Sequence, residues 1–242
     1  FIYLSLTAYE SHQPLNIIVA LKQIAEAPVM YHLGFMYIIL GLYLVAPIFQ
    51  IYANAAMENN LFYFIGLWFV INSVLMVFAK FFNFGFGIQF VGINGFVGYY
   101  IGGYLIKNFE IMGGQFKQKL ILMVLFIMSL AITMGGTYIL NNHGGTLDEF
   151  FYEYLSPNIV FMTFALFLLI KQTEPFLRKI TTRYLFLEKV LIKFRTVTFG
   201  IYFVHVLVLV ALSGHLGLHL TALSFNPVAS VPFLVILVTL IS

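Results

Sequence analysis

The chain is 242 residues long, 62% hydrophobic and only 9% charged, with a net charge of +3 at pH 7 and no cysteine. A soluble domain is roughly 25% charged, so this composition excludes soluble globular, disordered and nucleic-acid-binding proteins, and it leaves no thiol for disulfides or metal sites. We predict an all-α, polytopic transmembrane helical bundle, with room for about seven or eight spans of about 20 residues each.

The chain opens and closes in apolar sequence. Residues 1–7 lack the basic flank of a signal peptide and are interpreted as the remnant of a span, and the run from 227 to 242 as a span that stops early. We therefore expect a fragment, cut at both ends, of one transmembrane domain over residues 1–242. Between the ends, hydropathy predicts six complete spans, at residues 31–52, 61–80, 88–106, 118–140, 155–170 and 197–213.

Positive charge in short loops predicts the orientation of the spans. Of the 12 Lys and Arg residues, three lie between the third and fourth complete spans and seven between the fifth and sixth. Alternating spans place both loops on one side, whereas Lys22 and Lys80 fall on the other. Loops 107–119 and 171–196 are thus predicted to be cytoplasmic, and loops 8–30, 81–87, 141–154 and 214–226 external.

Residues 172–195 in the cytoplasmic loop have a pattern of their own. Ile180, Tyr184, Leu187 and Leu191 recur at helical spacing among basic residues, which is typical of an amphipathic helix in the membrane interface. One interpretation is a helix held by anionic lipid headgroups. The other is a basic rim for an anionic cytosolic ligand such as a nucleotide-bearing cofactor.

The third complete span carries a row of glycines. Gly92, Gly95, Gly98 and Gly102 are spaced to lie along one helix face, where small residues let neighbouring helix backbones approach closely. Packing is the favoured interpretation of this row. Gln89 and Asn94, near the external end of the same span, are candidates to line a polar cavity.

Histidines are the strongest candidates for chemistry. His205 lies about 15 Å into its span, counted from Arg195 at 1.5 Å per residue, and an ionisable group at that depth is a functional candidate, although a neutral imidazole bonded to a neighbouring helix remains the alternative. His32 lies at the external mouth of the first complete span. His215 and His219 form an incomplete metal site, His143 belongs to an external turn, and His12 gives no specific signal.

Three segments resemble the membrane acyltransferase 3 family. Residues 31–47 (YHLGFMYIILGLYLVAP) are similar to its HLWFLY…GLYL…P segment, residues 198–205 (TFGIYFVH) to its FGIYLIH segment, and residues 98–105 (GYYIGGYL) to its FLLGYYL helix. Their order and spacing extend the resemblance over most of the chain. The sequence departs from the family pattern at Gly34, where Trp is usual, and at Val206, where Pro often follows the His.

The resemblance implies a fold of about ten spanning helices, of which this chain would hold the remnant of the third and helices four to ten. It implies transfer of an acyl group, commonly acetyl from acetyl-coenzyme A, to a surface carbohydrate or related acceptor, in a multi-pass protein of the cell membrane and with no metal. The main catalytic His, ten residues after an Arg in the first helix, would lie upstream of Phe1, so the chain alone is expected to be inactive. The residues assigned here are the catalytic His205 and His32, the coenzyme A-binding Arg178, Arg183, Lys193 and Arg195, and the cavity-lining Tyr37, Gln89, Asn94 and Tyr202.

Two other classes of function stay open. A transporter or flippase of a saccharide or lipid-linked substrate would move its cargo without consuming acyl-coenzyme A, and a structural membrane partner would have no activity. The chain shows no internal repeat of the kind found in many transporters, which favours the acyltransferase.

Overall fold

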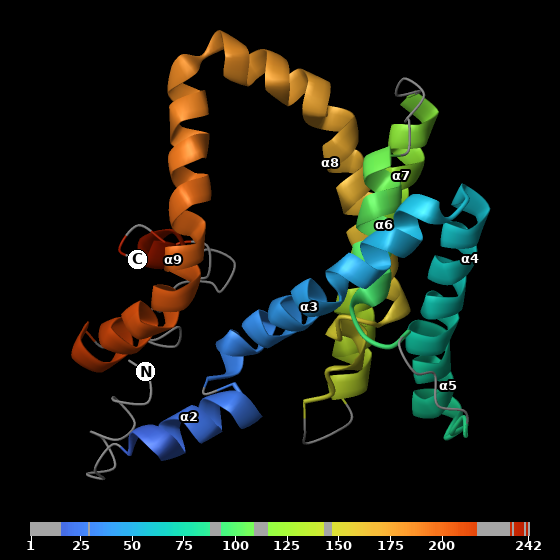
Figure 1. The fold of residues 1–242 in the computed structure, drawn as a ribbon, viewed down its shortest axis with the longest axis horizontal. Coiled ribbons are helices and arrows are strands. Elements are labelled where there is room, and N and C mark those ends of the chain that lie inside the picture. Colours follow the sequence, from blue (N-terminus) through green and yellow to red (C-terminus); the bar gives the residue numbers. More distant parts are fainter. Residues whose placement is uncertain are drawn as a thin grey trace. The chain divides into compact units, whose positions relative to one another are not determined.

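The computed structural model describes residues 16–28, 30–87, 93–108, 116–142, 147–216, 233, 235–239 and 241. Every regular element among them is helical (Figure 1), which confirms the all-α prediction. By packing, the chain divides into a terminal unit, Phe1–Tyr37 with Lys179–Ser242, and a central unit, Ile38–Arg178. The elements are α2 (Ile17–Glu26), the 3₁₀ turn η1 (Tyr31–Leu33), α3 (Gly34–Ala55), α4 (Glu58–Phe69), the π-helix η2 (Val70–Val74), α5 (Leu75–Phe82), α6 (Val97–Asn108), α7 (Phe116–Asn141), the 3₁₀ turn η3 (Phe150–Tyr152), α8 (Pro157–Arg183) and α9 (Leu185–Leu216).

Five stretches of the described residues are long and apolar enough to cross a membrane. They confirm five of the six predicted complete spans, all except 88–106, and extend most of them by several residues. The N-terminal remnant lies outside the described residues. Of the run from 227 only residues 233, 235–239 and 241 are described, and these are helical. The five stretches are Gly34–Ala55, Glu58–Phe82, Phe116–Asn141, Phe150–Arg183 and Glu188–Ala211.

The terminal unit contains a short helix, α2, that the hydropathy pattern does not predict. The side chain of Asn16 caps its first turn by accepting two backbone N–H bonds, at 3.0 and 3.4 Å, which satisfies donors that a helix start leaves unpaired. At the other end of α2, the Tyr37 hydroxyl donates to the carbonyl oxygens of Ile24 and Ala27, the latter at 3.2 Å. These bonds fix α2 against the start of α3.

The predicted interfacial segment 172–195 is helical on both sides of Tyr184. Its first part is the end of α8 and its second part is the beginning of α9. The guanidinium of Arg183 lies 5.9 Å from the centre of the Tyr184 ring at this break. The structure therefore joins the segment to two spanning helices instead of setting it apart as a separate helix.

In the central unit, α4 packs on α6 around a small apolar core. Ala53, Leu61, Ile101 and Leu105 are buried there together, and Trp68 is fully buried. Glycines make this packing possible, because a Cβ at Gly98 would lie 1.9 Å from the Trp68 ring, and one at Gly102 would lie 2.3 Å from the ring of Phe164. The packing interpretation of these glycines is confirmed, but they admit aromatic rings and not helix backbones.

The predicted span 88–106 is wrong at residues 93–96, the first of its residues that the structure describes. Residues 93–96 form a turn, and α6 begins only at Val97. Gly95 has φ 74°, a left-handed conformation that glycine adopts without strain, so it does not share a helix face with Gly98. Gly92 and Gln89 lie outside the described residues.

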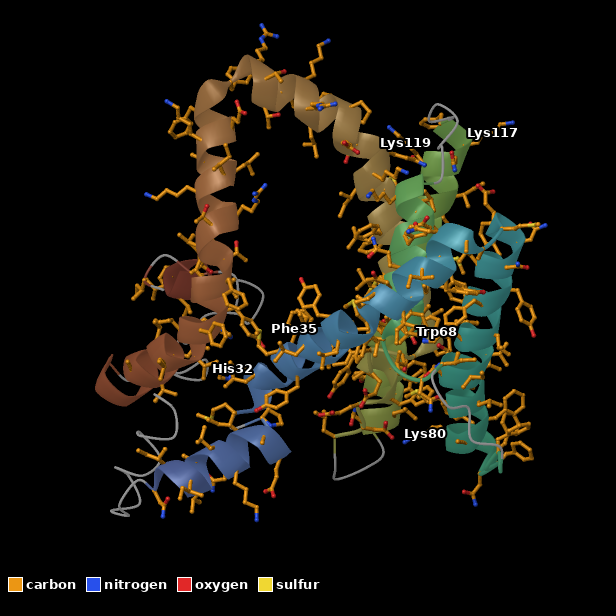
Figure 2. All side chains as sticks on the ribbon, in the orientation of Figure 1. His32, Phe35, Trp68, Lys80, Lys117 and Lys119 are labelled. Carbon is orange, nitrogen blue, oxygen red and sulfur yellow. The ribbon has the colours of Figure 1, made fainter. Side chains whose placement is uncertain are left out.

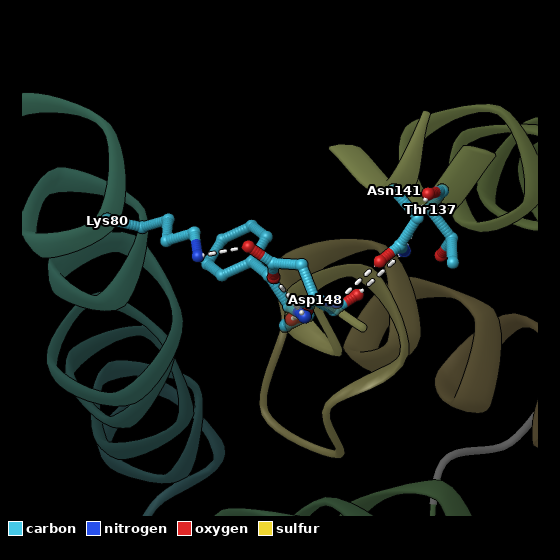
Figure 3. Close-up of polar contacts among 6 residues, drawn as sticks. Lys80, Thr137, Asn141 and Asp148 are labelled. Carbon is cyan, nitrogen blue, oxygen red and sulfur yellow. Dashed lines mark hydrogen bonds and ion pairs between the residues drawn. The ribbon is translucent and has the colours of Figure 1, made fainter. Parts of the chain in front are cut away.

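A polar cluster closes one end of the central unit (Figure 3). The ammonium of Lys80, in the last turn of α5, forms an ion pair with the carboxylate of Asp148. The carboxamide of Asn141 bridges the backbone of Asp148, accepting from its N–H at 2.5 Å and donating to its carbonyl at 3.1 Å. The Lys80 ammonium and the backbone N–H of Phe150 hold the pKa of the Asp148 carboxyl below its usual value.

A second polar contact marks the opposite end of the central unit. The Lys171 ammonium, from α8, donates to the last carbonyl groups of α6, those of Ile106 and of Lys107, the latter at 3.0 Å. A cation there satisfies carbonyl groups that the end of a helix leaves unpaired. Figure 2 shows Lys117 and Lys119 at this end of the unit, Lys80 at the other and Trp68 between them.

Candidate functional site

Two histidines and a tyrosine meet in the terminal unit. His32 lies in η1, directly before α3, whereas Tyr202 and His205 lie one turn apart on α9. The rings of His32 and His205 are 5.3 Å apart between centroids and nearly perpendicular. The Tyr202 hydroxyl donates to the carbonyl oxygen of His32. The structure thus brings together three of the residues assigned from the sequence.

The backbone of α9 fixes which nitrogen of His205 carries a proton. Its Nδ1 lies 2.7 Å from the carbonyl oxygen of Tyr202 and 3.2 Å from that of Ile201. A carbonyl oxygen only accepts hydrogen bonds, so Nδ1 must be the donor. In the neutral ring this leaves the lone pair on Nε2, which is the arrangement that a general base requires.

His32 is held in its neutral form. It precedes the span Gly34–Ala55, and partial burial, followed by the nearby His205, lowers the pKa of its imidazole from 6.5. Burial disfavours the charged ring, and so does a neighbouring group that can itself carry positive charge. At neutral pH the contact therefore joins His205 to a neutral ring that can accept or donate a proton.

Aromatic rings and α2 support this cluster. Phe35, on the first turn of α3, packs its ring edge-on against Tyr202 with the centroids 5.9 Å apart, and Figure 2 shows it close to His32. No pattern in the sequence distinguishes Phe35 from the other aromatic residues of its segment. Tyr37, assigned as cavity-lining, directs its hydroxyl to the backbone of α2, so its visible contact is a structural one.

The basic residues assigned to coenzyme A are all exposed. Arg178 and Arg183 lie on α8, whereas Lys193 and Arg195 lie on α9. Residues two positions apart on a helix do not face the same way, so Lys193 and Arg195 point to different sides of α9. Lys189, four positions before Lys193, shares its face.

Asn94 lies in the turn before α6, and its side chain is exposed. It belongs to the central unit, as do its neighbours Asn72 and Trp68. Of the other histidines, His143 and His219 lie outside the described residues, while His215 falls within α9 with no description of its side chain.

The described helices define an integral membrane protein that spans the bilayer several times, with Tyr202 and His205 inside one candidate span and His32 directly before the start of another. A polarised imidazole of this kind can take a proton from a hydroxyl group while that group attacks a carbonyl carbon. A family model described as an acyltransferase domain matches residues 1–242. The chain therefore belongs to the membrane acyltransferase 3 family, a family of acyltransferases. It matches no curated protein and no solved structure.

Proposed function

We propose that the protein transfers an acyl group, commonly acetyl, from acyl-coenzyme A to a hydroxyl of a cell-surface carbohydrate or related acceptor. The family membership supports acyl transfer, and the observation that carries the hydroxyl acceptor is the His205 ring. Its Nδ1 is bonded to the backbone of α9, so that Nε2 can accept the proton of an alcohol. A histidine base of this kind activates a hydroxyl oxygen as the nucleophile.

In the proposed reaction, His205 Nε2 removes the acceptor's proton as its oxygen attacks the thioester carbonyl. The carbon–oxygen bond forms, the carbon–sulfur bond breaks, and the proton returns from the imidazolium to the departing thiolate. His32 lies against His205 and takes part by stabilising the proton there. Arg178, Arg183, Lys193 and Arg195 are proposed to attract the phosphates of coenzyme A, with Lys193 acting beside Lys189.

The test is a transfer assay on the protein expressed from its complete reading frame in membranes, supplied with radiolabelled acetyl-coenzyme A. Two products are measured, namely free coenzyme A and label in the carbohydrate fraction. His205→Ala is expected to reduce turnover by about 10²–10⁴-fold, the usual contribution of a general base. Thr196→Ala is the matched control, because its hydroxyl donates to the carbonyl of Ile192 in its own helix, at 2.9 Å, and to no other described residue.

If His205→Ala keeps full turnover at an expression level equal to that of Thr196→Ala, then His205 contributes to packing and not to the reaction. Movement of a saccharide across the membrane with no release of coenzyme A would instead support a transporter.

A further inference from the structure

The helix α6 is too short to cross a membrane. Its 12 residues extend about 18 Å at 1.5 Å per residue, against a hydrocarbon core of about 30 Å. The depth at which it begins follows from the two polar ends of the central unit. Lys80 with Asp148 marks one end, and Lys171 at the end of α6 marks the other.

The distances along the helices from the two polar ends of the central unit place the start of α6 near the middle of the membrane. Asn72 is eight residues before Lys80, or about 12 Å along the helix. Its carboxamide donates to the carbonyl of Ile93 at 3.0 Å and accepts from the N–H of Gly95 at 2.9 Å. From Val97 to Lys107, α6 rises about 15 Å. The two distances add to nearly the thickness of the core.

The π-helix η2 builds the contact that holds this turn. It interrupts the α4–α5 stretch at Val70–Val74 and contains Asn72, while Trp68 one turn earlier donates from Nε1 to the carbonyl of Gly95 at 2.7 Å. π-Helical turns inside α-helices occur frequently at functional sites. Here the interruption places an amide where it can bond the non-helical backbone of residues 93–95.

Polar groups at this depth are not fully satisfied by the protein. The side chain of Asn94 is exposed, and an amide exposed to hydrocarbon is costly. Ser73, next to Asn72, is completely buried, and its hydroxyl bonds to none of the described residues. Buried polar groups of this kind normally bind water. Non-helical backbone at membrane depth is likewise tolerated only when protein covers it or a water-filled cavity adjoins it.

One aromatic residue of the turn that holds Asn94, Phe96, packs its ring against two others. The ring of Phe96 is 6.2 Å from that of Tyr99, nearly parallel, and 5.8 Å from that of Tyr154. Tyr99 donates its hydroxyl to the carbonyl of Tyr154 at 2.5 Å, and the Tyr154 side chain is 59% exposed. An accessible aromatic ring together with an exposed amide suits a sugar ring, which offers both C–H groups and hydroxyls.

We propose that the turn at residues 93–96 lines a water-filled cavity reaching the middle of the membrane, where Asn94 and Tyr154 bind the hydroxyl-bearing acceptor. The cavity is inferred from the central unit alone. Only the identity of its ligand rests on the proposed function, so the two parts are tested separately.

The cavity is tested by cysteine labelling, since this chain has no cysteine of its own. Asn94→Cys is expected to react with a membrane-impermeant charged methanethiosulfonate at least tenfold faster than Ile127→Cys. Ile127 is the matched control, because it is 57% exposed at mid-length of α7, among apolar neighbours. Gly85→Cys, in the exposed loop after α5, reports full reactivity. Equal protection of Asn94→Cys and Ile127→Cys, with Gly85→Cys labelled, would overturn the cavity.

The ligand is tested by steady-state kinetics of acetyl transfer to the protein's acceptor carbohydrate. Asn94→Ala is expected to raise the KM for the acceptor at least fivefold, to leave the KM for acetyl-coenzyme A unchanged, and to be partly rescued by Asn94→Gln. An unchanged acceptor KM in a variant whose Asn94→Cys counterpart is labelled would overturn the ligand and leave the cavity standing. Loss of transfer in His205→Ala does not bear on the labelling result.

Discussion

His205 shows how one backbone contact can prepare a side chain for chemistry. A histidine inside a helix can turn its ring toward the carbonyl groups of the preceding turn, and here Nδ1 does so at 2.7 Å. The bond selects the tautomer and directs the other nitrogen away from the helix. The neighbouring His32, whose pKa is lowered, adds no fixed positive charge at neutral pH that would oppose proton uptake by His205.

The lowered pKa of His32 predicts a loss of stability in acid. Its imidazole has a pKa below 6.5 in the folded protein, first because of burial and second because of His205. The unfolded chain therefore binds a proton more readily than the folded one, and the free energy of unfolding falls as pH drops below 6.5. Above that pH both states are neutral at this residue, and the effect vanishes.

The measurement compares thermal unfolding of wild-type protein and His32→Gln in detergent, from pH 8 to pH 5. We expect the two midpoints to differ by a constant amount above pH 6.5 and to converge below it, since the variant lacks the titrating group. Titratable groups that lie away from His32 contribute equally in both proteins and cancel in the difference. Parallel curves over the whole range would contradict the assigned shift.

At the scale of elements, hydropathy predicts the long spans well, because lipid requires continuous apolar helices. The spans around Gly34–Ala55 and Glu58–Phe82 are examples. The same rule fails for α6, where the apolar run 88–106 contains a turn. Hydrogen bonds from Asn72 and Trp68 to the backbone of residues 93 and 95 stabilise that turn. These partners are more than twenty residues away in the sequence, so a local hydropathy window cannot detect them.

The sequence predicts which residues belong to the candidate site, but it does not predict that they contact one another. Depth in the membrane singled out His205, and the family resemblance pointed to the segments holding His32 and Tyr202. Their contact joins positions 170 residues apart, which no spacing rule predicts. Phe35 and Asn72 were missed because an isolated Phe or Asn in apolar sequence carries no signal until its neighbours are known.

The contact between α4 and α6 predicts that alanine substitution has very different effects at two glycines of α6. A Cβ at Gly98 would lie 1.9 Å from the Trp68 ring, whereas one at Gly103 would meet nothing within 4 Å. Gly98→Ala should lower the free energy of unfolding by about 1–3 kcal/mol through overpacking. Gly103→Ala should leave it unchanged or raise it by up to about 1 kcal/mol, since alanine favours a helix.

Both variants are compared by circular dichroism melting in the same detergent. The control is built into the pair, because the substitution and the helix are identical and only the neighbouring ring differs. An equal loss in both variants would mean that the Trp68 ring does not fill the space at Gly98.

At the scale of the whole molecule, the positions of the few charged residues indicate the direction of the membrane normal. In the central unit Lys80 with Asp148 lies at one end, whereas Lys107, Lys117 and Lys171 belong to the other (Figure 2). The structure thereby groups the loops as alternating spans require. The excess of basic residues in loops 107–119 and 171–196 predicts that these loops face the cytoplasm, because cytoplasmic loops are enriched in Lys and Arg.

This arrangement predicts opposite accessibility for two single cysteines in intact cells that express the protein. Gly85→Cys, at the Lys80 end, should react with an impermeant maleimide added outside the cells, because both its loop and its own position are exposed. Lys117→Cys, at the start of α7, should react only after the membrane is permeabilised. Each variant serves as the control for the other, since both positions are exposed, one in a loop and one at a helix end. The reverse labelling pattern would mean that the protein has the opposite orientation in the membrane. The basic residues proposed to bind coenzyme A would then lie on the side where coenzyme A is absent.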